Sequence, residues 1–329
     1  MKYKALVSEL RGQEVSTTIQ ERTLPPLSQN EVLIKAHFSS LNFKDALGIT
    51  GRGPIFKSFP RVGGIDVSGV VYESKTPHFM PGDKVLVTGC GLGENYDGGF
   101  AQYVRVASEN VISLPAQLTL EEAMIYGTAG FTAALCLSRL MTNGQSPDLG
   151  PIAVTGASGG VGSFAIYFLS HLGFKVVAIS GKPQLEDYLL QLGAHEIISF
   201  EKLKLGSKPL ETVRFGGAID NVGGETLSKL CGHTQLWGNI ACVGLTQSHE
   251  LKMTVMPLIL RGVSLLGISS NNCPNPLRRQ LWQELEGKLK PKDLSIFKTE
   301  QVGLDKIVSV AHSMLERKTH GRVVVKCES

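Results

Sequence analysis

The sequence has little charge and few aromatic rings. Charged residues occupy 19% of the 329 positions and aromatic residues occupy 7%, whereas soluble proteins usually carry roughly 25% charged residues. The net charge is only +4, and its carriers are spread too evenly for a nucleic-acid-binding surface. We therefore expect a chain that buries a large share of its surface, through its size or through self-association. The small positive charge is compatible with an anionic small-molecule ligand but not with nucleic-acid binding.

Cysteine pairs with metal-binding spacing are missing. The shortest gap between any two of the six cysteines is eleven residues, so there is no Cys-x-x-Cys pair. This excludes a zinc ribbon or finger and argues against a disulfide scaffold. A reducing compartment is the expected location for Cys90, Cys136, Cys231, Cys242, Cys273 and Cys327.

Long apolar runs are missing as well. No run reaches the ~18 residues of a membrane span, and residues 1–12 lack the apolar core of a signal peptide. We expect a cytoplasmic protein that does not cross a membrane.

Glycine is abundant, with 37 residues or about 11% of the chain, against a usual share of ~7%. Many of these glycines are clustered, which indicates tight turns and close backbone approaches. The length predicts two domains at about 150 residues each.

The pattern changes near residue 120. Before it, short alternating stretches predict strands at residues 3–8, 31–38, 65–72, 84–88 and 100–106, with Val32, Ile34, Ala36 and Phe38 on one face. Proline and glycine turns separate these stretches. The first part should be a small, mostly antiparallel barrel.

A capping box at Thr119 and Glu122 predicts the start of a buried helix that runs to about Met141. From residue 151 onwards, apolar runs begin near residues 151, 175, 196, 217, 239 and 263, each followed by a helix-sized segment. This spacing predicts βαβ units and an α/β fold with a doubly wound parallel sheet. Gly173 and Gly193 stand where helices should end.

After residue 270 the pattern changes again. Residues 275–290 and 305–317 look helical, and residues 323–326 form a last predicted strand. We expect this tail to rejoin the first domain.

A glycine-rich segment at residues 152–162 follows the first parallel strand and opens a helix. Free N–H groups and the helix dipole at such a helix start can bind a pyrophosphate, and side chains at Gly159 and Gly160 would block its approach. Gly162 would let the helix pack closely on the strand. The segment predicts a dinucleotide-binding loop.

The end of the second parallel strand indicates which dinucleotide is preferred. NAD-preferring sites often have an acid here for the ribose 2′-hydroxyl, but this chain reads Ser180-Gly181-Lys182, with no acid before Glu186. A hydroxyl and a lysine would hold a 2′-phosphate, so we predict NADPH. The alternative is that Lys182 is an ordinary solvated loop lysine.

The glycine loop also fits the short-chain dehydrogenase fingerprint, which requires a downstream Tyr-x-x-x-Lys. The later tyrosines, Tyr167 and Tyr188, are followed at the fourth position by His171 and Leu192. That family is therefore rejected.

Several segments together resemble the medium-chain dehydrogenase/reductase superfamily, in its zinc-free quinone oxidoreductase-like group and acrylyl-CoA reductase branch. These segments are residues 39–47, 64–66, 126–133, 154–162 and 320–322. The resemblance covers essentially the whole chain. It implies a GroES-like catalytic domain at 1–123 and 271–329 and a Rossmann NADPH-binding domain at 124–270.

The resemblance also bears on metal binding. Zinc alcohol dehydrogenases have a Gly-His-Glu stretch where this chain reads Gly64-Ile65-Asp66, and the cysteine expected near residue 45 is missing. A catalytic zinc would lack its soft and imidazole ligands. We expect no metal site and a metal-free hydride transfer.

The implied activity is NADPH-dependent reduction of the activated C=C of a 2-enoyl thioester, with acrylyl-CoA converted to propionyl-CoA. A close alternative is a quinone or general enone oxidoreductase, and a remote one is a non-catalytic NADPH-binding protein. A homodimer is expected through the edge strand at residues 263–268.

Asn42 and Asp45 are the candidate catalytic residues. Asn42 could donate to the oxyanion, and Asp45 could orient water or relay a proton. Alternatively, Asn42 caps the following helix and Asp45 only supports it. Phe43 stands where relatives usually carry Tyr, so it keeps a stacking face for the cofactor but has no hydroxyl for proton transfer.

The remaining cofactor contacts follow from the resemblance. The glycine-rich loop is expected to bind the pyrophosphate, and Ser180 and Lys182 are expected to bind the 2′-phosphate. Arg322 should reach the cofactor from the tail, unless it is a surface turn residue, and Thr128 could contact cofactor or substrate or only pack in the core. The predicted loop and strand-end contacts are Ser158, Gly159, Gly160, Val161, Asn221, Val243 and Gly244.

Basic residues could also attract a polyanionic CoA thioester by long-range steering, although a solvated surface explains them equally well. They are Lys44, Arg52, Lys57, Arg61, Arg278 and Arg279.

Overall fold

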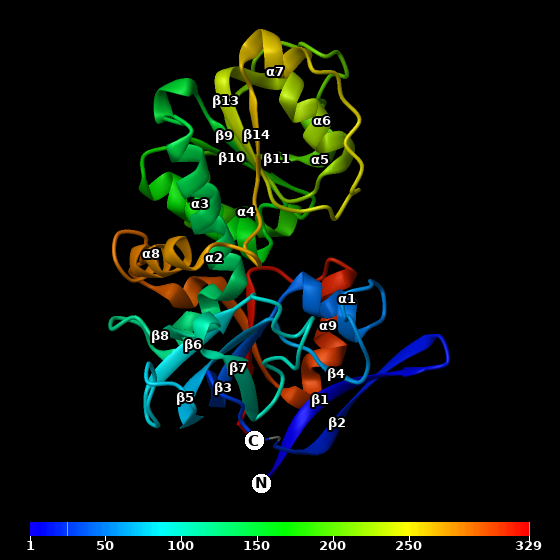
Figure 1. The fold of residues 1–329 in the computed structure, drawn as a ribbon. Coiled ribbons are helices and arrows are strands. Elements are labelled where there is room, and N and C mark those ends of the chain that lie inside the picture. The colour runs from blue at the N-terminus through cyan, green and yellow to red at the C-terminus, as the bar shows by residue number, and fades with distance from the viewer. Residues whose placement is uncertain (25, 329) are drawn as a thin grey trace. The chain divides into compact units, whose positions relative to one another are not determined.

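The computed structural model describes residues 1–24 and 26–328 and divides into two compact units (Figure 1). The first unit comprises Met1–Thr128 and Ser270–Ser329, and the second comprises Ala129–Ser269. The sequence-based boundaries at 123/124 and 270/271 fall close to these divisions.

The first unit is built on a seven-stranded sheet in the order β15-β16-β3-β5-β6-β8, with β7 also pairing with β3. All its pairs are antiparallel except β15 with β16. The strands are β3 (Glu31–Leu41), β5 (Asp66–Ser74), β6 (Lys84–Thr88), β7 (Tyr103–Ala107), β8 (Ile112–Ser113), β15 (Lys298–Gly303) and β16 (Arg322–Lys326).

A second, three-stranded sheet in this unit has the order β2-β1-β4. Its strands are β1 (Lys2–Arg11), β2 (Glu14–Thr23) and β4 (Arg61–Val62). The sequence did not reveal β2, because its residues are mostly polar, none of them is buried, and among the described strands it pairs only with β1. It also missed β15, which is half exposed and pairs with the C-terminal strand.

Of the four residues expected on one face of β3, three are buried. Val32, Ile34 and Ala36 are fully buried in the core, and Lys35 between them is exposed. The register shifts between Ala36 and Phe38, so Phe38 is only partly buried. A bulge of this kind changes the phase of alternation and therefore which side chains reach the core.

The tail returns to the first unit as expected. Strand β16 pairs antiparallel with β3, with Val323 opposite Leu41. The helices of this unit are α1 (Phe43–Ile49), α8 (Asn275–Glu286) and α9 (Ile307–Leu315), with short 3-10 helices η1 (Ser108–Asn110), η4 (Leu294–Phe297) and η5 (Leu304–Lys306).

Helix α2 (Leu120–Thr142) begins at the predicted capping box. Glu122 Oε2 accepts from the Thr119 N–H at 2.7 Å, and Thr119 Oγ1 accepts from the Glu122 N–H at 3.1 Å. The helix is kinked at Gly127. It is long and apolar enough to span a membrane, contrary to expectation, but 78% of its most apolar window is buried, as in the core helix of a soluble protein.

The second unit contains a six-stranded parallel sheet in the order β11-β10-β9-β12-β13-β14. This confirms the doubly wound prediction, because the chain runs outward from β9 in one direction and then in the other. The strands are β9 (Ile152–Thr155), β10 (Val176–Ser180), β11 (Glu196–Ser199), β12 (Phe215–Asp220), β13 (Thr234–Cys242) and β14 (Ser264–Gly267).

Helices α3 and α6 lie on opposite sides of this sheet (Figure 1). In addition to α2, this unit has the α-helices α3 (Gly160–His171), α4 (Glu186–Gln191), α5 (Phe200–Leu203), α6 (Gly224–His233) and α7 (Met256–Arg261). It also has the short 3-10 helices η2 (Pro147–Leu149) and η3 (Pro183–Leu185). Gly173 and Gly193 follow α3 and α4 with positive φ angles of 82° and 101°, as predicted for helix ends.

Candidate functional site

The first unit buries a group of polar side chains where β3 leads into α1. Asn42 is the N-cap residue of α1, and Asp66 opens β5. Asp45, Asp66 and Arg322 are at most 3% exposed. We call the group the Asp66 cluster, and its members are Ser40, Asn42, Asp45, Asp66, Thr128 and Arg322.

Asp66 is the hub of the cluster. Its Oδ2 accepts from Ser40 Oγ at 2.5 Å, from Asn42 Nδ2 at 2.8 Å and from the Thr128 N–H at 2.9 Å. Its Oδ1 accepts from Thr128 Oγ1 at 2.6 Å. The sequence had marked Asp66 only as a replacement for a zinc ligand, although an acid at the start of a buried strand already indicates a buried polar network.

Arg322 completes the cluster from β16. Its Nε donates to the Ile125 carbonyl at 3.0 Å, its Nη1 to Asn42 Oδ1 at 3.1 Å and its Nη2 to Ser40 Oγ at 2.8 Å. Its Nη2 also lies 3.8 Å from Asp66 Oδ2. The reading of Arg322 as a surface turn residue is therefore wrong, and contact with a cofactor stays a prediction.

The kink at Gly127 makes room for these groups. Its φ is 48°, and a Cβ there would lie 2.5 Å from Ser40 Oγ, 2.6 Å from Asp66 Oδ2 and 2.7 Å from Arg322 Nη2. Both the backbone conformation and the close approach require glycine.

Asp45 accepts hydrogen bonds at both carboxylate oxygens. Oδ2 accepts from the Asn42 N–H at 2.9 Å, and Oδ1 accepts from the N–H groups of Gly64 and Ile65 at 3.2 and 2.9 Å. Burial, with the negative charge of Asp66 as the second cause, raises the pKa of Asp45 to about 7. Asn42 thus stands at the N-cap of α1 and Asp45 supports it there through the Asn42 N–H, as the alternative interpretation expected. The catalytic role of both residues stays a prediction.

The donor set of the Asp66 cluster does not fit a metal ion. Both carboxylate oxygens of Asp66 are already occupied by hydrogen-bond donors, and a guanidinium lies beside them. Zinc prefers cysteine and histidine ligands, and within residues 1–24 and 26–328 no group of three or more His, Cys, Asp or Glu could hold a metal.

In the second unit, the glycine loop joins β9 to α3 as predicted. Gly156 has a φ of 57°, Gly159 is the N-cap of α3, and a Cβ on Gly162 would lie 2.7 Å from the Ala157 carbonyl oxygen. The first turn of α3 presents backbone N–H groups that have no partner within the helix. Glycine therefore forms a cradle that fits a pyrophosphate.

The ends of β9 and β12 are tied together beneath this loop. Thr155 Oγ1 donates to Asp220 Oδ1 at 2.7 Å and accepts from the Asn221 N–H at 2.9 Å. Asn221 Nδ2 donates to the Thr155 carbonyl at 2.7 Å. Burial raises the pKa of Asp220. Thr155 and Asp220 were not singled out from the sequence, because only the parallel pairing brings them together.

Val243 and Gly244 follow β13 and lie beside Asn221. Their N–H groups donate to the Asp220 carbonyl at 2.9 and 3.2 Å. A Cβ on Gly244 would lie 2.7 Å from the Asn221 carbonyl carbon. The structure thus brings these three candidates to the carboxyl edge of the sheet, where dinucleotides bind in such folds.

Ser180 and Lys182 lie at the end of β10, next to the glycine loop, because Ile179 pairs with Thr155. Ser180 is 6% exposed, and its Oγ accepts from the Lys182 N–H at 3.1 Å. Ser158 is also buried, whereas Gly159 is exposed and Gly160 and Val161 are half-buried.

Phe43 is 39% exposed at the first position of α1.

Two of the basic residues proposed for steering are not on the surface. Arg278 is 1% exposed and donates to the carbonyl groups of Thr88 and Ser270, and Arg61 is 9% exposed and donates to Ser58 Oγ. Both donate to loop residues, so the solvated-surface explanation is wrong for these two, and their steering role stays a prediction.

Two family models match the chain. The alcohol dehydrogenase GroES-like domain matches residues 28–116, and the zinc-binding dehydrogenase model matches residues 160–287. The chain is 42% identical over 325 residues to a Bacillus subtilis (strain 168) protein provisionally named quinone oxidoreductase YhfP, with 98% of each covered. It is 37% identical over 313 residues to the acrylyl-CoA reductase AcuI of Ruegeria pomeroyi, covering 95% of this chain and 94% of that one.

Solved structures agree over the whole chain. The yhdH oxidoreductase from Salmonella enterica, in complex with NADP, matches with a TM-score of 0.95, 40% identity and full coverage of both chains. Bacillus subtilis yhfP with NAD bound matches with a TM-score of 0.95, 41% identity and 99% coverage of both. The chain therefore belongs to the medium-chain dehydrogenase/reductase superfamily, in the branch that includes these acrylyl-CoA reductase and quinone oxidoreductase relatives.

Proposed function

We propose that the protein is an NADPH-dependent oxidoreductase that reduces the activated C=C of a 2-enoyl thioester, with acrylyl-CoA converted to propionyl-CoA. The observation that carries the proposal is the similarity to the Ruegeria pomeroyi acrylyl-CoA reductase, which extends over 95% of this chain and so includes both units.

The glycine cradle and the end of β10 support the choice of cofactor. Residues 158–161 would hold the pyrophosphate, and Ser180 with Lys182 would hold a 2′-phosphate. The cofactor, when bound, supplies the hydride. Of the two similar structures described above, the Salmonella enterica protein holds NADP and the Bacillus subtilis protein holds NAD. We favour NADPH because residues 180–185 of this chain contain no carboxylate to repel the 2′-phosphate.

Asn42 is proposed to stabilise the negative charge that develops on the thioester oxygen when hydride reaches the β-carbon. Its Nδ2 has one short hydrogen bond, to Asp66 Oδ2 at 2.8 Å, and two longer ones, to Asp45 Oδ2 at 3.2 Å and to the Ser40 carbonyl at 3.3 Å. A substrate oxygen can replace the longer pair. Arg322 would hold the amide in this orientation through Asn42 Oδ1.

Asp45 is proposed to orient water or to relay the proton that reaches the α-carbon. A pKa of about 7 lets it exist in both protonation states near neutral pH, which suits an acid that is reprotonated after each turnover.

Quinone or general enone reduction is the second candidate, favoured by the provisional name of YhfP. Steady-state oxidation of NADPH with acrylyl-CoA and with 1,4-benzoquinone separates the two, and we expect the larger kcat/KM with acrylyl-CoA. A wide margin for the quinone would overturn the thioester assignment. NADPH binding without turnover of either substrate would favour a non-catalytic role.

The edge of the parallel sheet supports self-association. Strand β14 pairs only with β13 in the described sheet, so one of its sides is free. Large apolar side chains are exposed on its partner strand β13, namely Leu236 and Trp237, and on the preceding helix α7, namely Ile259 and Leu260. Two copies could pair β14 edge to edge about a twofold axis. Sedimentation at micromolar concentration should give a dimer, and a monomer would contradict this.

The state of the cysteines supports a reducing compartment such as the cytoplasm. All six are free thiols, and burial raises the pKa of each one except Cys90 and Cys273 by a large margin. Thiols of this kind are poorly reactive.

A further inference from the structure

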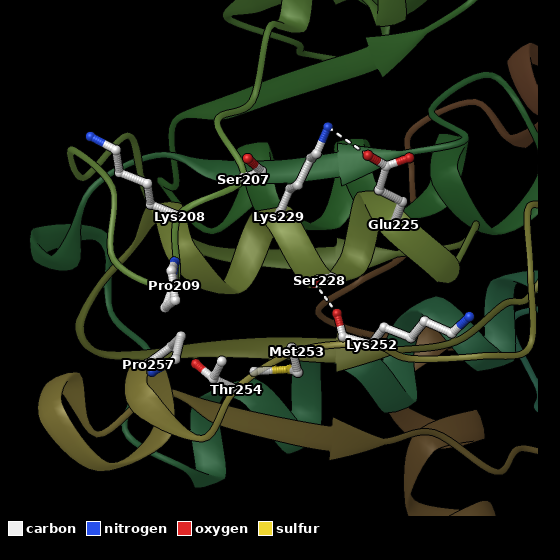
Figure 2. A pocket seen from close by; sticks show the side chains of 10 residues that line it. All are labelled: Ser207, Lys208, Pro209, Glu225, Ser228, Lys229, Lys252, Met253, Thr254 and Pro257. Atoms are coloured by element: carbon white, nitrogen blue, oxygen red, sulfur yellow. Dashed lines mark hydrogen bonds and ion pairs between the residues drawn. The ribbon is translucent and has the colours of Figure 1, made fainter.

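The second unit has a pocket away from the residues assigned to the cofactor. It lies between α6 and the segments at 207–209 and 252–257, and has a volume of about 420 Å³ (Figure 2). It is lined by Ser207, Lys208, Pro209, Glu225, Ser228, Lys229, Lys252, Met253, Thr254 and Pro257. None of these residues belongs to the glycine loop or to the predicted contacts that follow β10, β12 and β13.

One wall of the pocket is an irregular segment held by the buried side chain of His233 and the half-buried side chain of Arg261. His233 is 5% exposed, its Nε2 accepts from the Gly206 N–H at 3.0 Å, and its Nδ1 lies 2.8 Å from the Thr212 carbonyl, to which it donates. Arg261 Nη2 donates to the Glu211 carbonyl at 2.5 Å. The segment that carries Lys208 is therefore fixed at both of its ends.

The opposite wall is fixed by α6. Ser228 Oγ donates to the Lys252 carbonyl at 2.6 Å, as Figure 2 shows. Two residues earlier, the Thr226 N–H donates to Gln247 Oε1 at 3.1 Å. Both walls are thus held without a ligand, so the pocket is preformed, as small-molecule sites usually are.

The lining combines apolar surface with cations. Pro209, Met253 and Pro257 supply apolar contacts. The ammonium groups of Lys208 and Lys252 lie at opposite ends of the pocket, and Lys229 lies above it (Figure 2). Their flexible stems allow each ammonium group to swing towards a ligand.

The side chains that line the pocket carry a net charge of +2, from three lysines and one acidic residue, Glu225. Lys229 is paired with Glu225 at 2.8 Å, and Lys252 with Glu250 at 3.0 Å, where Lys252 is 87% exposed. Lys208 has no ion pair in the part of the chain that the structure describes. An anion would therefore find one unpaired cation and one that is held only by an exposed, weak pair.

We propose that this pocket is a second ligand site, which binds a small organic anion with an apolar body, such as a carboxylate or a phosphate ester, independently of the cofactor. Its volume lies near the lower end of the roughly 300–1,000 Å³ found for ligand sites, so it suits a compact acid.

The test uses 8-anilinonaphthalene-1-sulfonate, an aromatic sulfonate whose fluorescence rises in apolar surroundings. The full-length protein is titrated with the dye, with and without saturating NADPH. We expect one site per chain whose affinity is unchanged by NADPH and falls with added salt. In Lys208→Gln/Lys252→Gln the dissociation constant should rise about tenfold, which corresponds to ~1.4 kcal/mol. In Met253→Glu binding should be lost.

A matched control is Lys2→Gln/Lys318→Gln, which removes two exposed lysines of the first unit and should leave dye binding unchanged. Equal affinity in the Lys208/Lys252 variant, competition between dye and NADPH, or several weak sites per chain would each overturn the proposal. The NADPH dissociation constant and the turnover of the same variants should stay at wild-type values. A failure of the pocket is thereby separated from a failure of the proposed oxidoreductase function.

Discussion

Replacing Arg322 by methionine should destabilise the first unit more than any other single loss of charge in the Asp66 cluster. The change removes the hydrogen bonds to Ile125, Asn42 and Ser40 and leaves Asp66 buried without its cation. Breaking a buried ion pair by removing one partner costs about 3–5 kcal/mol. At roughly 2–4 °C per kcal/mol for a unit of this size, the melting temperature should fall by about 10 °C.

The stability lost in Arg322→Met should depend on pH. The guanidinium of Arg322 favours the charged form of Asp45, so its removal raises the pKa of Asp45 further above the value of about 7 that burial and the charge of Asp66 already produce. A carboxyl group with a raised folded-state pKa stabilises the fold at low pH, and this contribution disappears as pH rises through that pKa. The deficit should therefore be larger at pH 8 than at pH 5.

Thermal unfolding followed by circular dichroism at both pH values measures this prediction. Lys326→Met is the matched control, since Lys326 is exposed on the same strand and should change stability by about 0.5 kcal/mol or less. Adding Asp66→Asn to Arg322→Met should restore part of the loss, because the uncompensated charge is removed. A loss below about 1 kcal/mol, or an additive loss in the double variant, would refute the reasoning.

Three further predictions concern the remaining site residues. In the wild type, kcat should fall as pH rises through about 7 if Asp45 delivers the proton, and Asp45→Asn should lower kcat and flatten the profile; an unchanged profile in the variant would exclude Asp45. Gly127→Ala should destabilise the first unit by at least about 1–2 kcal/mol, measured by urea unfolding, because its φ is 48° and its Cβ would meet Ser40, Asp66 and Arg322; wild-type stability would mean that the kink can relax. Lys182→Gln should raise the NADPH dissociation constant about tenfold in calorimetry and leave that of NADH unchanged. Equal changes for both cofactors would show that Lys182 does not contact the 2′-phosphate.

Much of the second unit could be predicted because its signals are local. The apolar runs of a parallel sheet are buried on both faces, so each strand is visible without knowledge of its neighbours. The helix-ending Gly193 depends on residues only a few positions apart, and so does the capping box at Thr119 and Glu122 in the first unit. For the same reason the sequence alone predicts the glycine-rich segment at residues 152–162.

The exposed strands β2 and β15 could not be predicted in this way. Half of the residues in each strand are solvent-exposed and only Val302 is buried, so hydrophobic alternation does not distinguish these strands from loops. They are strands because β1 and β16 supply backbone hydrogen-bond partners.

The sequence by itself determined the doubly wound sheet, its dinucleotide loop and the N-terminal cap of α2, since each follows from periodicity or from contacts within a few residues. Only the tertiary structure decided that Arg322 donates a buried hydrogen bond to Asn42, 280 positions away in the sequence. It also placed Asp66 at the centre of their cluster, where it accepts from Asn42. It also decided that Arg278 points inward to carbonyl groups. A charged residue has the same hydropathy wherever it stands, and the partners that make its burial possible come from strands that meet only when the chain folds.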